Sequence, residues 1–185
     1  MTTAGLVLAA GAGTRYGQPK APVMVSGERL VDRAVRVLAE GGCDPIVVVL
    51  GAWVGEVDGA DIVVNDAWPE GMGSSLREGL LSLTERDGID AVVVTLVDLP
   101  GLTAEAVRRI ATASPAAPVV QAAYAGERGH PVRMSRELWG EAIDVARGDE
   151  GARRLLRGRD DVVLVEVGDV ADGYDIDVPA DTPSE

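Results

Sequence analysis

The stretch LVLAAGAGTRYGQPK, residues 6–20, passes from an apolar run into a glycine-rich loop and ends at a lysine flanked by prolines. Glycine loops that follow the first strand of an α/β protein commonly bind phosphates. Here Gly11, Gly13 and Gly17 are spaced one residue too widely for the G-x-G-x-x-G dinucleotide fingerprint, and no Gly-Lys-Ser/Thr completes a P-loop. The loop therefore matches neither of these two classes.

Two prolines, Pro19 and Pro22, flank Lys20. Both known loops need a helix that begins straight out of the loop with its amino end facing the phosphates, whereas proline is not tolerated within a helix. We therefore predict that the loop stays open and holds its ligand with backbone N–H groups, with Arg15 and Lys20 as cations. Lys20 is also the only lysine among 17 basic residues, and its compact ammonium differs physically from a guanidinium.

The composition predicts one domain over residues 1–185, because 185 residues with 46% hydrophobic content can bury a substantial core. The net charge of −13 argues against nucleic acid or an anionic membrane as a partner, since most of the surface would repel them. An anionic ligand can still bind locally, because charges farther away than about 8 Å are largely screened at physiological salt.

The single cysteine, Cys43, excludes an intrachain disulfide and a thiolate zinc cluster. The apolar N-terminal stretch lacks the basic region of a signal peptide, and Arg15 interrupts it. The other apolar runs are shorter than the roughly 20 residues that span a bilayer. The sequence therefore predicts a cytoplasmic protein.

Short β-branched runs alternate with helical patterns, which is typical of a mostly parallel sheet with crossover helices. Strands are expected at residues 4–8, 45–50, 62–64, 91–97, 119–123 and 162–167. Helices are expected at residues 30–40, 76–86, 104–113, 136–147 and 150–158. Ser75 and Glu78 form a capping-box pattern at the second helix, and Asp149 is the expected N-cap of the last helix.

Ligands of such sheets bind beyond the carboxyl ends of the strands. The glycine loop, residues 71–75 and Asp98 all follow strands, so we expect them to converge. Asp98 ends the buried run TLVDLP, where a carboxylate can coordinate Mg²⁺; a solvated turn aspartate is the alternative. Asp177 in DIDVPAD is a second candidate, with a surface acidic tail as its alternative.

Two further stretches carry candidate residues. NDAWPEGMGSS, residues 65–75, combines glycines and serines at a helix start, which lets a flat nucleobase approach the backbone; a capped helix and nothing more is the alternative. The only histidine, His130, lies in ERGHPVRM before a proline. We interpret it as structural rather than catalytic, because no serine or cysteine nucleophile pattern accompanies it.

The loop LAAGAGTRYGQPK resembles the signature of nucleotidyltransferases with a Rossmann-like fold, approximately L-A-A-G-x-[GS]-x-R-x-G-x-x-K, with Tyr16 where the family has methionine. Nearly the whole chain is similar to the MobA-like molybdenum cofactor nucleotidyltransferases, and especially to their cytidylyltransferases. The segments with counterparts there, in the same order, are GMGSSLREGL, LVDLP, RGHPV, GDEGARRLL and DIDVPAD. The resemblance implies a single three-layer α/β domain of the nucleotide-diphospho-sugar transferase type, with a mostly parallel sheet.

The resemblance also implies a reaction, in which a nucleoside monophosphate passes from a nucleoside triphosphate to the terminal phosphate of molybdopterin and pyrophosphate is released. Mg²⁺ is the implied cofactor, CTP and molybdopterin are the implied substrates, and a molybdenum hydroxylase or its chaperone is an implied transient partner. Phosphoryl transfer needs positioning and charge neutralisation but no protein nucleophile. The absence of a nucleophile pattern is then expected.

Roles for individual residues follow from the same resemblance. The implied catalytic residues are Lys20, Arg15 and Asp98, the implied metal ligands are Asp98 and Asp177, and the implied acceptor-side residues are His130 and Asp149. The implied nucleotide-binding residues are Leu8, Ala9, Ala10, Gly11, Gly13, Thr14, Lys20, Gly73, Ser74, Ser75 and Gly79. Residues 8–11 would hold the base and ribose, and residues 11–15 the triphosphate.

Several alternatives remain open at this stage. The guanylyltransferase branch tends to read L-A-G-G where this chain has Ala9 and Ala10, which favours CTP over GTP. A sugar-phosphate nucleotidyltransferase and a non-catalytic carrier of the finished cofactor are further alternatives. A NAD-binding dehydrogenase would need an acidic residue at the end of the second strand, and that strand ends in Leu50 and Gly51.

Overall fold

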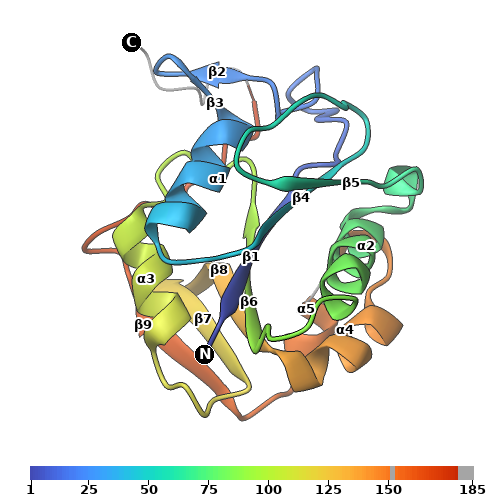
Figure 1. Ribbon diagram of the computed structural model, residues 1–185. Coiled ribbons are helices and arrows are strands. Elements are labelled where there is room, and N and C mark those ends of the chain that lie inside the picture. Colours follow the sequence, from blue (N-terminus) through green and yellow to red (C-terminus); the bar gives the residue numbers. More distant parts are fainter. Residues whose placement is uncertain (151–152, 179–185) are drawn as a thin grey trace.

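The computed structural model describes residues 1–150 and 153–178, which form three layers with a seven-stranded sheet in the middle (Figure 1). The strand order is β5-β4-β1-β6-β8-β7-β9. The strands are β1 (Thr3–Leu8), β4 (Ile46–Leu50), β5 (Asp61–Val64), β6 (Ala91–Leu96), β7 (Val119–Tyr124), β8 (Glu127–Ser135) and β9 (Val162–Glu166), with β2 (Met24–Val25) and β3 (Glu28–Arg29) forming a separate ribbon.

Most of the neighbouring strands run parallel. Strands β5, β4, β1 and β6 pair in parallel, β9 is parallel to β7, and only β8 runs antiparallel to both of its neighbours. The carboxyl ends of β1 and β6 therefore lie at one edge of the sheet, with the residues that follow them side by side. The predicted α/β fold with a mostly parallel sheet is confirmed.

Helices cover both faces of the sheet (Figure 1). On one face α1 (Leu30–Glu40) and α3 (Ala104–Thr112) bury side chains such as Leu38 and Ile110 against the strands, and on the other α2 (Met72–Thr84) and α4 (Trp139–Val145) bury Leu80 and Trp139. Each fully buried aliphatic side chain contributes about 1.5–3 kcal/mol relative to exposure. Two apolar layers, one on each face of the sheet, therefore support the strand ends at which the pocket opens.

Helix α2 begins four residues earlier than predicted. Gly71 is the N-cap residue of the helix, and no side chain caps the helix there. Ser75 lies inside the helix, so the predicted capping box is wrong. The physical reason is that the buried amide of Asn65 donates to the hydroxyls of Ser74 and Ser75, at 2.8 and 3.0 Å, and holds them away from a capping position.

The last two predicted helices are shorter in the structure. The first consists of a 3-10 turn, η2 (Arg136–Leu138), followed by α4, and the second is reduced to α5 (Arg153–Leu156). Asp149 lies in a 3-10 turn, η3 (Gly148–Glu150). Because residues 151–152 lie outside the described part of the chain, its role as an N-cap stays a prediction.

Strand β8 was not predicted from the sequence. Its alternation of side chains is interrupted by Pro131, which lies where the β7–β8 register shifts, and by the buried Arg133. Proline inside a sheet is largely confined to edges and irregular pairing. The guanidinium of Arg133 donates to the carbonyls of Ser114 and Ala117, each at 2.9 Å, so it ties β8 to the loop after α3.

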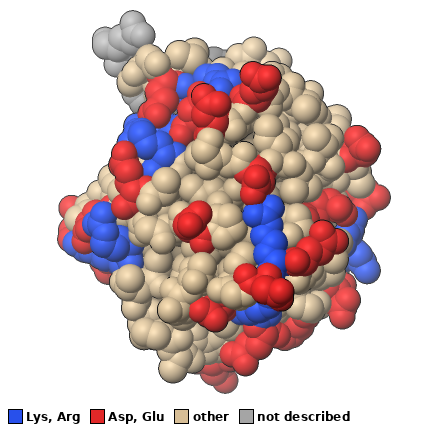
Figure 2. Space-filling model, viewed as in Figure 1, with Lys and Arg blue, Asp and Glu red and all other residues tan. Residues whose placement is uncertain are grey.

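Acidic side chains are spread over the face shown in Figure 2, and the basic side chains there lie mostly beside acidic ones. Within residues 1–150 and 153–178, no helix has the length and apolar character needed to cross a bilayer.

Candidate active site

A pocket of about 440 Å³ opens at the carboxyl ends of β1 and β6. It brings together segments that are far apart in the sequence, as the sequence analysis expected. The predicted site residues that line it are Leu8, Ala9, Ala10, Gly11, Gly13, Thr14, Arg15, Lys20, Ser75, Asp98, Asp149 and Asp177. The pocket is also lined by Ala12, in the range predicted for the triphosphate, and by Trp68, Pro69, Gly71 and Met72, in the predicted segment 65–75. Leu96 and Val97 are lining residues that the sequence analysis did not predict.

The glycine loop leaves β1 without entering a helix, which confirms the predicted open conformation. Gly13 has a φ of 61°, and a Cβ at this position would overlap the carbonyl oxygen of Gln18, so only glycine fits. The Gly17 N–H donates to the Gly13 carbonyl at 2.7 Å, which closes a tight turn. This turn carries the chain from Arg15 back to Lys20.

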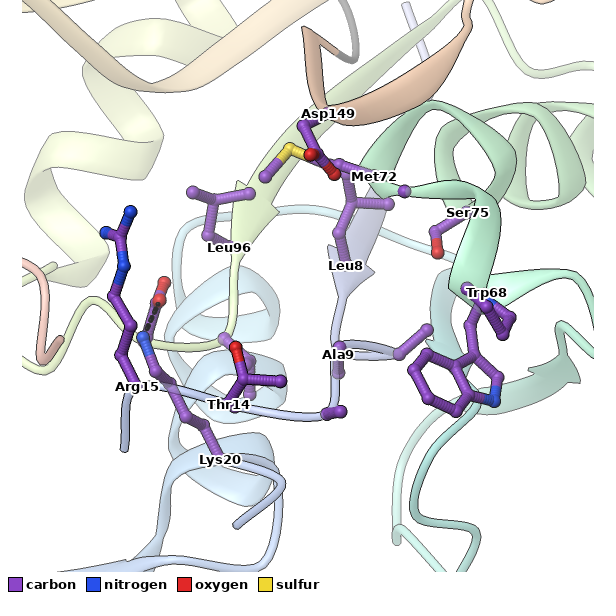
Figure 3. Close-up of a pocket in the computed structure, with 18 of the residues that line it drawn as sticks. Leu8, Ala9, Thr14, Arg15, Lys20, Trp68, Met72, Ser75, Leu96 and Asp149 are labelled. Carbon is purple, nitrogen blue, oxygen red and sulfur yellow. Dashed lines mark hydrogen bonds and ion pairs between the residues drawn. The ribbon is translucent and has the colours of Figure 1, made fainter. Parts of the chain in front are cut away.

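Two cations and two carboxylates meet at one end of the pocket. The Lys20 ammonium donates to Asp98 Oδ2 at 2.7 Å and to Asp177 Oδ1 at 3.4 Å, and Arg15 Nη1 lies 3.3 Å from Asp177 Oδ2. Figure 3 shows Lys20 and Arg15 side by side at this end. Burial lowers the pKa of Lys20, but hydrogen bonds and charge from Asp98 and Asp177 outweigh it and raise that pKa overall, so the ammonium stays charged.

The second carboxylate reaches the pocket on a segment that follows the last strand. Asp98 stands two residues after β6, and the Ile176 N–H donates to the Asp98 carbonyl at 3.0 Å. Ile176 is fully buried and so anchors this segment. Asp177 follows directly, beside Lys20.

The carboxylates fit a divalent metal ion. Asp98 Oδ1 is buried and has no hydrogen-bond partner among the described residues, and an unpaired buried carboxylate oxygen is costly unless a cation binds it. Mg²⁺ is commonly held by one or two carboxylates together with substrate phosphates and water. Within the described residues, no group of three or more His, Cys, Asp or Glu side chains is placed to hold a metal ion by itself.

The opposite end of the pocket is largely uncharged. Trp68, in the 3-10 turn η1 (Trp68–Glu70), and Ser75 lie there, far from Lys20 in Figure 3. Gly51 packs so closely under Trp68 that a Cβ would lie 2.8 Å from the Trp68 Cγ. Asn65 donates to the Ser75 hydroxyl, which leaves the Ser75 hydrogen without an acceptor among the described residues. Ser75 can therefore donate to a ligand.

Three predicted nucleotide-binding residues do not line the pocket. The Ser74 hydroxyl lies 2.9 Å from the Ala67 carbonyl oxygen and 2.8 Å from the Gly71 carbonyl oxygen, and its single hydrogen is donated to these backbone acceptors rather than to the pocket. Gly73 packs against the backbone of Arg147, and Gly79 packs against Leu6. Contacts of Gly73, Ser74 and Gly79 with a nucleotide stay predictions.

The two predicted acceptor-side residues lie apart. Asp149 lines the pocket near Met72 (Figure 3), whereas His130 does not line it. The Nδ1 atom of His130 is buried and has no partner among the described residues. Burial is the largest effect on His130, and it lowers the pKa of the imidazole, as does the charge of Arg153. The Val94 backbone and the charge of Asp98 raise this pKa but do not outweigh burial. The imidazole is therefore neutral at pH 7.

Sequence reasoning missed Trp68 and Asn65. Both lie in the segment NDAWPEGMGSS, for which the prediction of a nucleobase site rested on the glycines and serines and not on these two residues. A tryptophan beside a proline between a strand and a helix was the available signal. The buried role of Asn65, which is 1% exposed, had no signal in the spacing.

A protein-family model described as the MobA-like NTP transferase domain matches residues 5–163. Among curated proteins, nicotine blue oxidoreductase of Paenarthrobacter nicotinovorans is 36% identical, with 94% of this chain and 91% of that protein covered. The probable molybdenum cofactor guanylyltransferase of Opitutus terrae is 35% identical, with 55% of this chain and 50% of that protein covered.

Solved structures are also similar. Rv0371c of Mycobacterium tuberculosis superposes with a TM-score of 0.80 at 29% identity, covering 96% of this chain and 94% of that one. A complex of the same protein with manganese gives a TM-score of 0.74 at 28% identity, covering 100% and 94%. A 2-C-methyl-D-erythritol 4-phosphate cytidylyltransferase of Thermus thermophilus, at 19% identity and a TM-score of 0.70 over 98% and 96%, shares the fold alone.

Proposed function

Because the chain belongs to the MobA-like NTP transferase family, we propose that it transfers CMP from CTP to the terminal phosphate of molybdopterin and releases pyrophosphate. The feature that carries this proposal is the cluster of Lys20, Arg15, Asp98 and Asp177 at one end of the pocket. Cations and carboxylates in contact at the end of a glycine loop are the groups that a triphosphate and its metal ion require.

The chain's own residues bind and orient the nucleotide. Backbone N–H groups of residues 11–15 hold the triphosphate, and Arg15 and Lys20 offset its charge. Asp98 and Asp177 are the residues that would hold a divalent ion, which supplies further charge neutralisation when bound. A solved structure of the relative Rv0371c is a complex with manganese, which supports a divalent ion as the cofactor, and Mg²⁺ is the ion that we propose.

The acceptor supplies the nucleophile. A terminal phosphate oxygen of molybdopterin forms a bond to the α-phosphorus of CTP, and the bond from that phosphorus to the bridging oxygen breaks, so that pyrophosphate leaves with the electron pair. The residues of the site position both phosphates for in-line attack, which is the main contribution of a protein to phosphoryl transfer. His130, neutral at pH 7, positions the acceptor or its loop and does not transfer a proton.

Cytosine is the proposed base, and guanine is the alternative. Ala10 lines the pocket, and we propose that a second glycine at this position would leave more room for a purine. The probable guanylyltransferase among the relatives keeps GTP open, since it matches this chain over 55% of its length. A carrier that holds the finished cofactor without catalysis would have no use for the Lys20–Asp98 ion pair.

One observation favours a second candidate function. The relative that is 36% identical is called an oxidoreductase, so reduction of an aromatic substrate with a nicotinamide cofactor is the competing hypothesis. The end of β4, Leu50, offers no acidic side chain for the adenosine ribose of a nicotinamide dinucleotide, which argues against this hypothesis.

The test is to incubate the enzyme with each of the four nucleoside triphosphates and molybdopterin, with Mg²⁺ present. We expect pyrophosphate and a cytosine dinucleotide product with CTP. The same enzyme incubated with NADH or NADPH and a reducible dye should leave the absorbance at 340 nm constant. Absence of pyrophosphate and of a dinucleotide product with every triphosphate, or oxidation of NADH or NADPH coupled to reduction of the dye, would contradict the proposal.

A further inference from the structure

Tyr124, the last residue of β7, lies at the junction of three segments and takes no part in the proposed chemistry. Its hydroxyl donates to the backbone carbonyl of His130 at 2.7 Å. Its ring packs against the buried apolar layer below α1 and α3. Burial, followed by the charges of Asp172 and Glu166, raises the pKa of Tyr124 to about 12, so the hydroxyl remains a donor at neutral pH.

Two glycines press against the Tyr124 ring. A Cβ at Gly129 would lie 2.8 Å from Tyr124 Cε2, and a Cβ at Gly173 would lie 2.7 Å from Tyr124 Cδ2. Neither glycine has a positive φ, so the backbone conformation would accept any residue. The Tyr124 ring is therefore the reason that glycine is needed at positions 129 and 173. The ring also sets how closely the two segments that contain these glycines can approach it.

The segment that contains Gly173 carries the second carboxylate into the pocket. We call residues 168–177 the strap. The Asp172 N–H donates to the Gly101 carbonyl at 3.1 Å, and the Ile176 N–H donates to the Asp98 carbonyl at 3.0 Å. The strap ends at Asp177, which pairs with Lys20. Three residues thus separate Gly173, which contacts the ring, from Asp177, which carries the carboxylate.

We propose that Tyr124 is a positioning residue for the metal site: its contact with Gly173 holds the strap on the path that brings the Asp177 carboxylate beside Lys20 and Asp98. Tyr124 touches neither the ion nor the nucleotide, and acts only through the strap. The inference rests on the proposed function in one respect, namely that Asp98 and Asp177 hold a divalent ion together. Groups that orient metal ligands commonly change metal affinity by about 10- to 100-fold when they are altered.

The first test is Gly173→Ala in the full-length protein, with Mn²⁺ binding measured by electron paramagnetic resonance. Because the added methyl must displace the ring or the strap, we expect the Kd for Mn²⁺ to rise about tenfold. Amide hydrogen exchange at Ile176 should become faster, since its bond to Asp98 depends on the strap. Gly140→Ala is the matched control, because a Cβ there meets nothing within 4 Å, and both readouts should stay at the wild-type values.

A second variant separates positioning from simple damage to the fold. Tyr124→Leu shortens the side chain that the new methyl contacts, so Gly173→Ala should change the Kd for Mn²⁺ much less in this background than in the wild type. Contacting residues are expected to be non-additive in this way. Tyr124→Phe keeps the ring and removes only the bond to His130, so it should change Mn²⁺ affinity less than Gly173→Ala does.

The outcomes separate this inference from the proposed function. Unchanged Mn²⁺ affinity and unchanged Ile176 exchange in Gly173→Ala would overturn the positioning role and leave the nucleotidyl transfer standing. Equal effects of Gly173→Ala in both backgrounds would also overturn it. If Asp98→Asn binds Mn²⁺ as tightly as the wild type, the shared metal site itself is refuted.

Discussion

The two ends of the pocket are held together by different forces. At the charged end, Arg15, Lys20, Asp98 and Asp177 are held by ion pairs with one another. At the neutral end, which contains Trp68 and Ser75, the polar groups are held by the buried Asn65 and by close backbone packing.

This difference separates function from stability. The ion pairs of the charged end can be exchanged for contacts with phosphates and a metal ion, because each side chain keeps its charge when its partner changes. The hydrogen bonds of Asn65 are internal, and a ligand does not replace them. Substitutions at the charged end should therefore change turnover, and substitutions behind the neutral end should change stability.

The largest effect is expected for Lys20→Ala. Loss of a charge-assisted phosphate contact costs about 1.5–3 kcal/mol for each bond, and Lys20 can make more than one, so turnover should fall on the order of a hundredfold or more. Lys20→Arg should also be impaired, because a guanidinium fork does not replace the compact ammonium. Steady-state kinetics, with circular dichroism as the folding check, provide the measurement. Wild-type kcat/KM in a folded Lys20→Ala variant would refute the role of the charged end.

The next effect concerns the carboxylates. Asp98→Asn should lose the Mg²⁺-dependent activity, and Asp177→Asn should weaken that activity by roughly tenfold, since the loss of one charged ligand contact costs about 1.5–3 kcal/mol. Titrations of rate against Mg²⁺ concentration measure both. Asp61→Asn, at a surface ion pair with Arg86 outside the pocket and the strap, is the matched control. Titration curves that coincide with the wild type in both site variants would return these carboxylates to ordinary surface turns.

Behind the neutral end, Asn65→Ala should lower the free energy of unfolding by about 1–3 kcal/mol, because the hydroxyls of Ser74 and Ser75 and the Ala67 N–H lose a buried partner. Mg²⁺ dependence should be retained. Urea denaturation measures the first quantity and the metal titration the second. An Asn65→Ala variant that is as stable as the wild type but responds differently to Mg²⁺ would contradict this separation of stability and function between the two ends of the pocket.

A smaller effect is expected on the preference for one base over another, which we assign to the neutral end of the pocket. CTP should exceed GTP by at least tenfold in kcat/KM, and Ala10→Gly should narrow the gap, because a methyl-sized difference is worth about 1–3 kcal/mol. Competition assays with both nucleotides provide the ratio. A measured preference for GTP would refute the cytidylyltransferase proposal and leave nucleotidyl transfer intact.

The smallest effect is on stability at alkaline pH. The pKa of Lys20 is raised above its ordinary value of 10.5, so the stability that it contributes is complete below pH 10.5 and is lost as pH rises through the raised pKa. The free energy of unfolding should therefore fall more steeply above pH 10.5 in the wild type than in Lys20→Met. Parallel curves for the two proteins would show that the ion pair contributes nothing.

The sequence alone predicted the parallel part of the fold and all four charged residues of the charged end. Strands and helices such as β1 and α1 have strong periodic patterns, and Lys20 and Asp98 follow a loop and a strand whose carboxyl ends share one edge. The strand β8 was missed because Gly129, Pro131 and Arg133 break its alternation. Its pairing is decided by neighbours distant in the sequence.

The neutral end was predicted less well for a related reason. The start of α2 depends on Asn65, which lies six residues upstream of Gly71 and donates into the helix. Local capping patterns do not contain that contact, so Ser75 was interpreted as a cap. The ion pair between Lys20 and Asp177 spans 157 residues, and likewise only the folded chain shows it.

The most direct test of this division is a crystal structure of the protein with CTP and Mn²⁺, with the metal located by its anomalous scattering. The account predicts manganese bound to Asp98 and Asp177, phosphates against Arg15 and Lys20, and cytosine beside Trp68 and Ser75. A base at the charged end, or manganese away from both carboxylates, would contradict it.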